Sequence, residues 1–195
     1  MLDTGHDQTH SRHMTTIRTA IGADGPRLSR PAATTFRDAF EAENSPEDME
    51  RYLAEAFTPE QQAAEIADTD NTILVAQDGN SADNVELVGY AHLASGSTPE
   101  AVVGPAPLEL KRLYVARAWH GRGVAQALMN ALLDAARARG AKTLWLGVWE
   151  RNPRGVAFYE KYAFTRVGEH SFTLGSDVQT DWVYARPLED VTRRD

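Results

Sequence analysis

A glycine-rich turn near the middle of the chain has the residue types that bind a phosphate. Gly121 and Gly123 follow an apolar stretch and precede a long amphipathic one, an order that predicts a strand, a tight turn and a helix. The free N–H groups at a helix start, and the positive end of its dipole, favour a phosphate or pyrophosphate there. Glycine has no Cβ, so an anion can approach the backbone closely. We therefore expect an anionic ligand at this turn.

Two common phosphate-binding loops do not match this turn. A P-loop requires Gly-Lys followed by Ser or Thr, which the chain lacks. A dinucleotide-binding fingerprint requires a third glycine at the position of Gln126. A turn for the phosphates of an acyl-CoA remains as the third candidate.

The distribution of charge also favours an anion on the middle segment. Residues 111–161 carry a net charge of +7, whereas residues 1–110 carry −13 and the whole chain −8. Solvated helix faces explain part of this contrast, and the rest suits an anionic ligand on the middle segment and a cationic one facing the N-terminal half. The acidic total argues against a nucleic-acid partner.

Composition excludes several other classes of protein. The chain has no cysteine, so it holds no disulfide, thiolate metal site or cysteine nucleophile, and this is compatible with the cytoplasm, where we expect the protein. No apolar run is long enough to span a membrane. We expect one domain over residues 16–188, between tails at 1–15 and 189–195. The N-terminal tail carries three histidines, and we predict no metal site in it or elsewhere.

The order of elements predicts an α+β protein with a mixed central sheet. Proline after an N-capping residue marks two helix starts, at Ser45-Pro46 and Thr58-Pro59. Five helices are expected. They cover residues 31–43, a stretch that begins at residue 46, residues 59 to about 67, the stretch from the glycine turn to residue 139, and residues 153–162. Strands are expected at 17–20, 72–76, 85–93, 109–115, 143–148, 165–173 and 180–186, with a turn at 79–81 and a loop at 95–107.

Two motifs resemble those of the GNAT N-acetyltransferase superfamily. The turn His120-Gly121-Arg122-Gly123-Val124-Ala125 resembles its acyl-CoA turn, although His120 stands where glutamine or arginine is usual and Arg117 where proline is common. The segment from Asn152 to Phe164 resembles its second motif, with Ala163 in place of a glycine. The resemblance implies a mixed, mostly antiparallel sheet with helices on both faces.

The resemblance also implies acetyl-CoA as cosubstrate, with direct attack of the acceptor amine in a ternary complex. Asn152 is explained equally well as a helix N-cap. Arg122 and Lys161 could pair with the cofactor phosphates, and their alternative is exposure to solvent. The residues that the resemblance places on the cofactor are Leu113, Tyr114, Val115, His120, Gly121, Arg122, Gly123, Val124, Ala125, Asn152, Tyr159 and Lys161.

Two residues match the superfamily's acid and base. A primary amine is neutralised at pH 7 at a cost of about 4.6 kcal/mol, so a base is useful, and Glu109 matches the superfamily's strand glutamate. Glu109 could instead pair with a neighbouring cation, and Glu150 and Asp181 are further candidates. Tyr159 matches the tyrosine that hydrogen-bonds the leaving thiolate. Its alternative is packing, with Tyr162 as the next candidate for the acid.

Further segments look like the PaiA-type spermine/spermidine N-acetyltransferases. They lie at 44–57, 144–150, 170–175 and 179–181, and they imply a polyamine acceptor, with Glu41, Glu43, Glu47 and Asp48 near its ammonium groups. Two alternatives stay open: an acetyltransferase for another small amine, and a non-catalytic acyl-CoA sensor. His92 and His170 are expected to be structural, and the resemblance is compatible with a homodimer.

Overall fold

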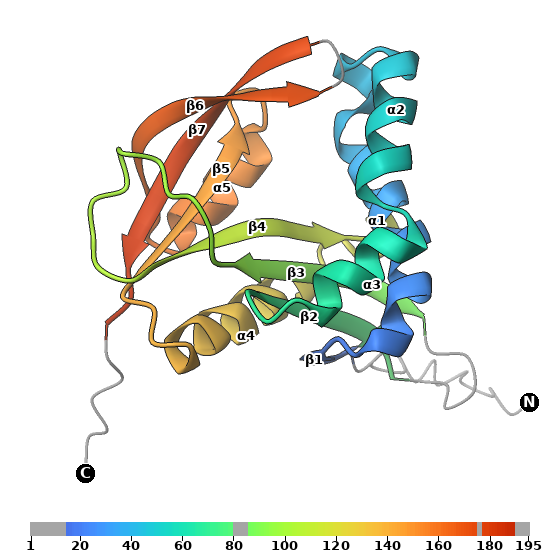
Figure 1. Ribbon diagram of the computed structural model, residues 1–195, viewed down its shortest axis with the longest axis horizontal. Coiled ribbons are helices and arrows are strands. Elements are labelled where there is room, and N and C mark those ends of the chain that lie inside the picture. The colour runs from blue at the N-terminus through green and yellow to red at the C-terminus, as the bar shows by residue number, and fades with distance from the viewer. Residues whose placement is uncertain (1–14, 80–85, 175–176, 190–195) are drawn as a thin grey trace, which may run out of the picture.

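A seven-stranded sheet forms the centre of the protein (Figure 1). The computed structural model describes residues 15–79, 86–174 and 177–189. The expected tails, apart from Thr15 and Glu189, lie outside these residues, as do Asn80 and Ser81 of the expected turn. The strands are β1 (Thr15–Thr19), β2 (Asn71–Asp78), β3 (Leu87–Ala94), β4 (Pro107–Val115), β5 (Thr143–Trp149), β6 (Thr165–Leu174) and β7 (Asp177–Pro187), in the order β1-β2-β3-β4-β5-β7-β6. The helices are α1 (Gly25–Phe40), α2 (Pro46–Ala56), α3 (Pro59–Ala67), α4 (Val124–Ala138) and α5 (Pro153–Lys161).

Alternating apolar residues give the sheet two buried faces. In β2, Leu74 and Ala76 belong to the core under α4 and α5, whereas Ile73 and Val75 belong to the core under α1 and α2. Successive side chains of a strand point to opposite faces, so this pattern requires a helix layer on each side. The predicted mixed, mostly antiparallel sheet with helices on both faces is confirmed. None of the helices in the described part of the chain is long and apolar enough to cross a bilayer.

The parallel pair β4–β5 opens the sheet. Every other neighbouring pair is antiparallel, and the parallel register covers only Pro107–Glu109 against Thr143–Trp145. Beyond Glu109 and Trp145 the two strands diverge, with β5 following β7 and β4 staying with β3 (Figure 1). The divergence leaves a gap in the sheet beside the start of α4.

The helix starts follow local capping chemistry, with one correction. Ser45 Oγ accepts from the N–H of Asp48 at 3.1 Å and caps α2, as predicted. Such a cap contributes about 1 kcal/mol. The first helix, however, begins at Gly25 and not at Pro31. Pro26 occupies its first turn, where no N–H donor is required, and Pro31 lies inside the helix.

Candidate active site

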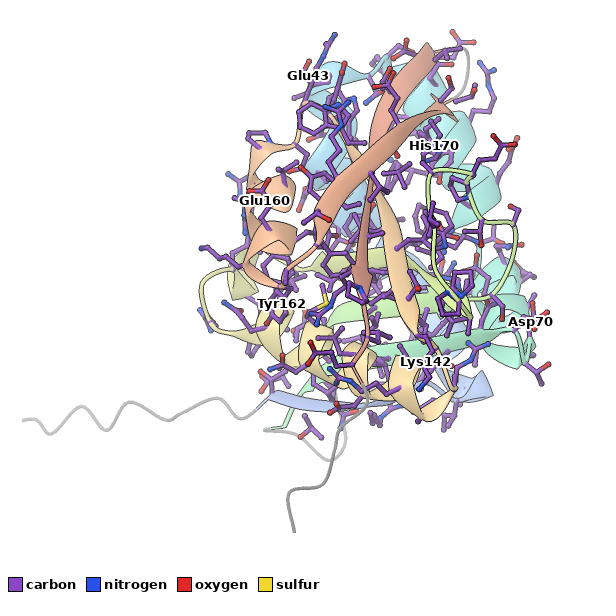
Figure 2. The ribbon with its side chains drawn as sticks, turned by 90° about the vertical axis from the view of Figure 1, so that its left-hand side faces the viewer. Glu43, Asp70, Lys142, Glu160, Tyr162 and His170 are labelled. Carbon is purple, nitrogen blue, oxygen red and sulfur yellow. The ribbon has the colours of Figure 1, made fainter. Side chains whose placement is uncertain are left out.

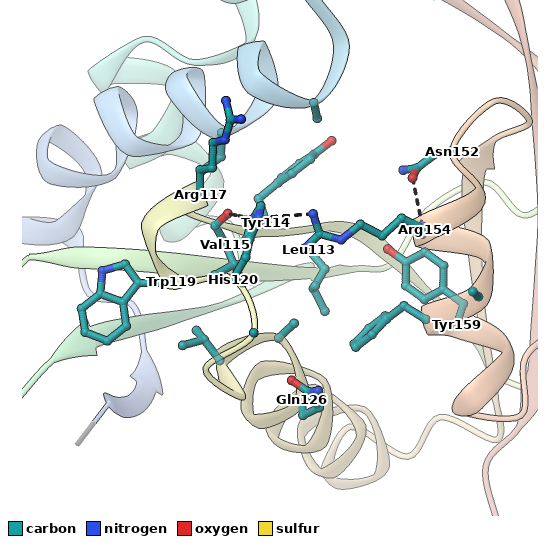
Figure 3. Close-up of a pocket in the computed structure, with 18 of the residues that line it drawn as sticks. Leu113, Tyr114, Val115, Arg117, Trp119, His120, Gln126, Asn152, Arg154 and Tyr159 are labelled. Carbon is teal, nitrogen blue, oxygen red and sulfur yellow. Dashed lines mark hydrogen bonds between the residues drawn. The ribbon is translucent and has the colours of Figure 1, made fainter. Parts of the chain in front are cut away.

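A cleft of about 760 Å³ lies where β4 and β5 diverge, between β4, the start of α4 and α5 (Figure 3). Of the residues assigned to the cofactor from the sequence, all but Arg122 line it. Arg122 instead places its guanidinium 5.0 Å from the centre of the Trp119 ring. The assigned residues that line the cleft thus come from three parts of the chain: β4, the turn with the start of α4, and the segment that contains α5.

The turn before α4 presents backbone donors to the cleft. Gly121 and Gly123 have φ angles of +76° and +82°, in the left-handed region that favours glycine. Gly123 is the N-cap of α4 and has no side chain with which to cap it. The first N–H groups of the helix have no partner within the helix, and Ala125 and Gln126 of this first turn line the cleft. The arrangement suits an anion, as the sequence predicted.

His120 links this turn to the opposite wall of the cleft. Its Nε2 lies 2.9 Å from the carbonyl oxygen of Val115, and its Nδ1 lies 3.2 Å from Nη1 of Arg154 on α5 (Figure 3). Because a guanidinium only donates, Nδ1 must accept, so Nε2 carries the proton and donates to Val115.

Cations predominate on the walls of the cleft. Among the described residues that line it, Arg117, Arg154 and Lys161 stand against one carboxylate, that of Asp38. Asn152 lines it too, and its Oδ1 accepts from the N–H of Gly155 at 2.9 Å. The capping explanation of Asn152 therefore holds, and the amide nitrogen of its side chain remains for a ligand.

Tyr159 projects from α5 into the cleft between aromatic neighbours (Figure 3). Its ring lies 5.6 Å from that of Phe158 and 5.9 Å from that of Phe164, centre to centre. Burial raises the pKa of Tyr159 to about 12. The phenol is thus a hydrogen-bond donor throughout the neutral range, and full loss of its proton to a thiolate of pKa near 8.5 would cost roughly 5 kcal/mol.

Glu109 lies outside this cleft, on the face of the sheet that α1 and α2 cover. Burial raises the pKa of its carboxyl, against the opposing influence of Lys111, His170 and Arg112. The neighbouring cations are engaged by Glu65, whose Oε2 lies 2.6 Å from Nη1 of Arg112 and whose Oε1 lies 3.9 Å from Nζ of Lys111. Glu109 is therefore available to a ligand of the gap.

Most of the acidic residues predicted near the acceptor have arginine partners. Glu43 lies 3.8 Å from Arg151, and Glu47 and Asp48 lie 3.7 and 3.4 Å from Arg51. Asp48 is also buried beside Ser45, the N-cap of its helix. These arginines partly neutralise the carboxylates, which reduces the charge they can offer to a substrate.

Comparison with known proteins decides the family. The model of the acetyltransferase (GNAT) family matches residues 34–164. The chain belongs to this family. An uncharacterised N-acetyltransferase in the pepI 3′ region of Lactobacillus delbrueckii subsp. lactis is 32% identical over 166 residues, 85% of this chain and 92% of the relative. An uncharacterised N-acetyltransferase of Mycobacterium tuberculosis is 33% identical over 166 residues, 85% of this chain and 98% of the relative.

A solved structure shares the fold of this acetyltransferase. The PaiA N-acetyltransferase from Thermoplasma acidophilum, solved in complex with coenzyme A, superposes with a TM-score of 0.69 at 20% identity. The match covers 89% of this chain and 99% of the PaiA chain.

Sequence reasoning missed several residues of the acetyltransferase's cleft. Asp38, Gln126 and Arg154 line it without having been assigned to it. Arg154 carried a signal, because it belongs to the basic segment and comes two residues after the assigned Asn152. No signal in the sequence pointed to Asp38, because α1 approaches β4 only in the folded chain. Within the described ranges, no three His, Asp or Glu side chains are grouped as metal ligands would be.

Proposed function

We propose that this acetyltransferase transfers the acetyl group of acetyl-CoA directly to a primary amine in a ternary complex, and that its preferred acceptor is a linear polyamine. The observation that carries the proposal is the cleft at the β4–β5 divergence, with helix-start N–H groups at one end and the Tyr159 phenol on one wall. The volume of this cleft and the excess of cations on its walls suit an anionic cosubstrate.

The cleft residues fit coenzyme A. The N–H groups following Gly123 would hold the pyrophosphate, with Arg154 and Lys161 supplying positive charge from α5. The main-chain groups of Leu113 and Val115 would hold the pantetheine arm, because β4 has left its pairing with β5 there. The PaiA protein of similar fold was solved with coenzyme A, which supports the same cosubstrate for this chain. Bound acetyl-CoA supplies an activated acetyl thioester.

Tyr159 acts on the leaving group in this proposal. A phenol that keeps its proton can donate a hydrogen bond to the sulfur as negative charge develops there. Glu109 is the residue that the sequence suggests as the acceptor of the amine proton. Burial raises the pKa of its carboxyl group, which makes the carboxylate a stronger base. Direct transfer makes positioning and electrostatic stabilisation the main sources of rate.

The polyamine acceptor rests on charge and on the resemblance to PaiA-type enzymes. The arginine partners of Glu43, Glu47 and Asp48 weaken the contribution of those carboxylates. Glu109 and Asp181 then become the main candidates to receive an ammonium, because burial raises the pKa of both. A cation beside such a carboxylate relieves the penalty of burying its charge.

An amine panel tests the proposal. Acetyl-CoA turnover is measured with spermidine, spermine, a monoamine of similar length and an amino acid, at low and high salt. We expect spermidine to have the highest kcat/KM, with a preference that shrinks as salt screens the charges. Equal kcat/KM for monoamine and spermidine would overturn the polyamine assignment and favour another small amine. Tight binding of coenzyme A without turnover of any amine would favour a sensor.

A further inference from the structure

Gly147 has no Cβ, and two ionisable side chains occupy the space beside it on β5. A Cβ at this position would lie 2.8 Å from Nε2 of His170 and 3.3 Å from Oδ2 of Asp181. His170 belongs to β6 and Asp181 to β7, where the two are register partners (Figure 2 shows His170 on β6). The imidazole and the carboxylate thus converge on one point from two strands.

This point lies at the divergence of the sheet. Gly147 is two residues beyond Trp145, where the pairing of β5 with β4 ends, and it faces the same side of the sheet as Trp145. Glu109 is the register partner of Trp145, so its side chain lies on that side as well. Glu109, His170 and Asp181 form what we call the acceptor triad.

Aromatic rings of α1 and α2 pack against rings of β5 and β6, the strands that carry Gly147 and His170. Tyr52 of α2 lies 6.0 Å from Phe172 of β6, and Phe40 of α1 lies 5.9 Å from Trp149 of β5, centre to centre. These contacts bring the first two helices over the far ends of β5 and β6 (Figure 1). Aromatic faces suit both the methylene chain and the charge of an alkylammonium ion.

We propose that the acceptor amine binds next to the ends of His170 and Asp181 that meet beside Gly147, with Asp181 binding its ammonium form and Nε2 of His170 taking its proton. The proposal rests on the proposed function and assigns to these two residues the step that the sequence assigned to Glu109. Imidazole is the side chain best suited to accept a proton near neutral pH. Glu109 then acts as a positioning residue that holds His170 electrostatically.

The step balances as a proton transfer followed by acyl transfer. An N–H bond of the ammonium breaks, its proton goes to Nε2 of His170, and the nitrogen keeps the electron pair. That pair then forms the bond to the acetyl carbon, while the carbon–sulfur bond breaks and its electrons leave with sulfur. The nitrogen loses a second proton, the sulfur ends as a thiol, and one proton in total is released to solvent.

Charged neighbours complete the environment of the triad. Lys111 and Arg112 of β4 act on Glu109, and Tyr52 of α2 interacts electrostatically with Asp181. Burial raises the pKa of both Glu109 and Asp181, whereas His170 opposes the rise at each. Two partly buried carboxylates near one imidazole therefore form a site in which an added cation is stabilised.

The experiment compares His170→Gln, Asp181→Asn and Glu109→Gln by spermidine kinetics from pH 6 to 10 at saturating acetyl-CoA. We expect His170→Gln to lower kcat at pH 7 about 100-fold, with a deficit that shrinks towards pH 10 because free amine becomes abundant. Asp181→Asn should raise the KM for spermidine about tenfold and change kcat less. A pH profile of kcat that is unchanged in His170→Gln would overturn the proposal. So would a profile that loses its acidic limb in Glu109→Gln but not in His170→Gln.

A second variant and a binding measurement keep the test independent of turnover. Gly147→Ala would place a methyl 2.8 Å from Nε2 of His170, so the imidazole has to shift. Because only the end of a side chain has to move, the fold should persist while the KM for spermidine rises. In protein loaded with coenzyme A, the NMR signals of the His170 ring should shift on addition of spermidine, and less so in Gly147→Ala. Absence of this shift at saturating amine overturns the inference. Failure of the proposed function is a separate result, namely no acetylation of any amine by the wild type.

Discussion

Nη1 of Arg154 lies 3.2 Å from Nδ1 of His120, and this contact joins α5 to the turn before α4 across the cleft. Nε2 of His120 in turn hydrogen-bonds to the carbonyl oxygen of Val115 at the end of β4. A ligand that fills the cleft competes for the same groups, because a phosphate is a better acceptor for a guanidinium than a neutral imidazole. Arg154 is thus placed to exchange its partner within the protein for a phosphate.

The first prediction concerns this exchange. Arg154→Ala should raise the Kd for coenzyme A about tenfold, since a charge-assisted hydrogen bond contributes on the order of 1.5 kcal/mol. Isothermal titration calorimetry measures the effect. Arg151→Ala is the matched control, because Arg151 is exposed, pairs with Glu43 and does not line the cleft. Equal affinities of the two variants would remove Arg154 from the binding site.

The second prediction concerns the anion-binding turn. Gly123→Asp should weaken coenzyme A binding at least 100-fold, because it adds a negative charge where the helix dipole and free N–H groups favour an anion. Gly123→Asn separates charge from backbone strain and should bind more tightly than Gly123→Asp.

Gly140→Asp controls for the strain alone. Gly140 has a φ of +79°, close to the +82° of Gly123, and at both positions an added Cβ would meet no atom within 4 Å, but Gly140 ends α4 away from the cleft. Gly140→Asp should lower the Tm while leaving the Kd for coenzyme A within about twofold. Similar losses of affinity in both aspartate variants would contradict a pyrophosphate at Gly123.

Local sequence signals predicted most of the elements and the glycine turn before α4. Ser45 and Thr58 cap their helices as expected, because N-capping depends on residues three apart. The turn at Gly121 and Gly123 could be predicted because a glycine turn also depends on neighbouring residues. The start of α1 was misplaced because two prolines, Pro26 and Pro31, both satisfy the rule for a first turn, and packing decides between them.

The acceptor side could not be read in the same way. Glu109, Gly147, His170 and Asp181 come from four strands, and only the register of the sheet brings them together. The presence of a glycine in a strand does not predict which side chains of other strands will pack beside it. The pairing of Glu65 with Arg112 likewise joins residues 47 positions apart, and it decides that Glu109 is left for other partners.

The third prediction concerns Tyr159. Tyr159→Phe should lower kcat about 100-fold while the KM for acetyl-CoA stays within about threefold, because a donor needed mainly in the transition state contributes little to ground-state binding. Tyr162→Phe is the control, since the hydroxyl of Tyr162 lies 3.4 Å from the carbonyl of Gln126 and does not line the cleft. A larger loss of kcat in Tyr162→Phe would transfer the acid role to that residue.

The last prediction concerns a buried histidine and the pH dependence of folding. His92 has no exposed surface, and its Nε2 lies 2.9 Å from Oδ1 of Asn71. Burial, together with Arg112 and Lys111, lowers the pKa of His92 to about 3. In the unfolded chain a histidine titrates near pH 6.5, so the unfolded state binds an extra proton below that pH. The stability contributed by neutral His92 is therefore complete above about pH 6.5 and is lost progressively as the pH falls towards 3.

Denaturant unfolding at pH 6.5, 5.5 and 4.5 tests this effect of His92. The free energy of unfolding of the wild type should fall by up to about 1.4 kcal/mol per pH unit through this group. His92→Gln retains a donor for Asn71 but does not titrate, so its free energy of unfolding should fall less steeply. Glu109 and Asp181, whose burial raises their pKa values, act in the opposite direction but are common to both proteins, so the difference in slope isolates His92. Parallel slopes would show that His92 takes up its proton equally in the folded and unfolded states.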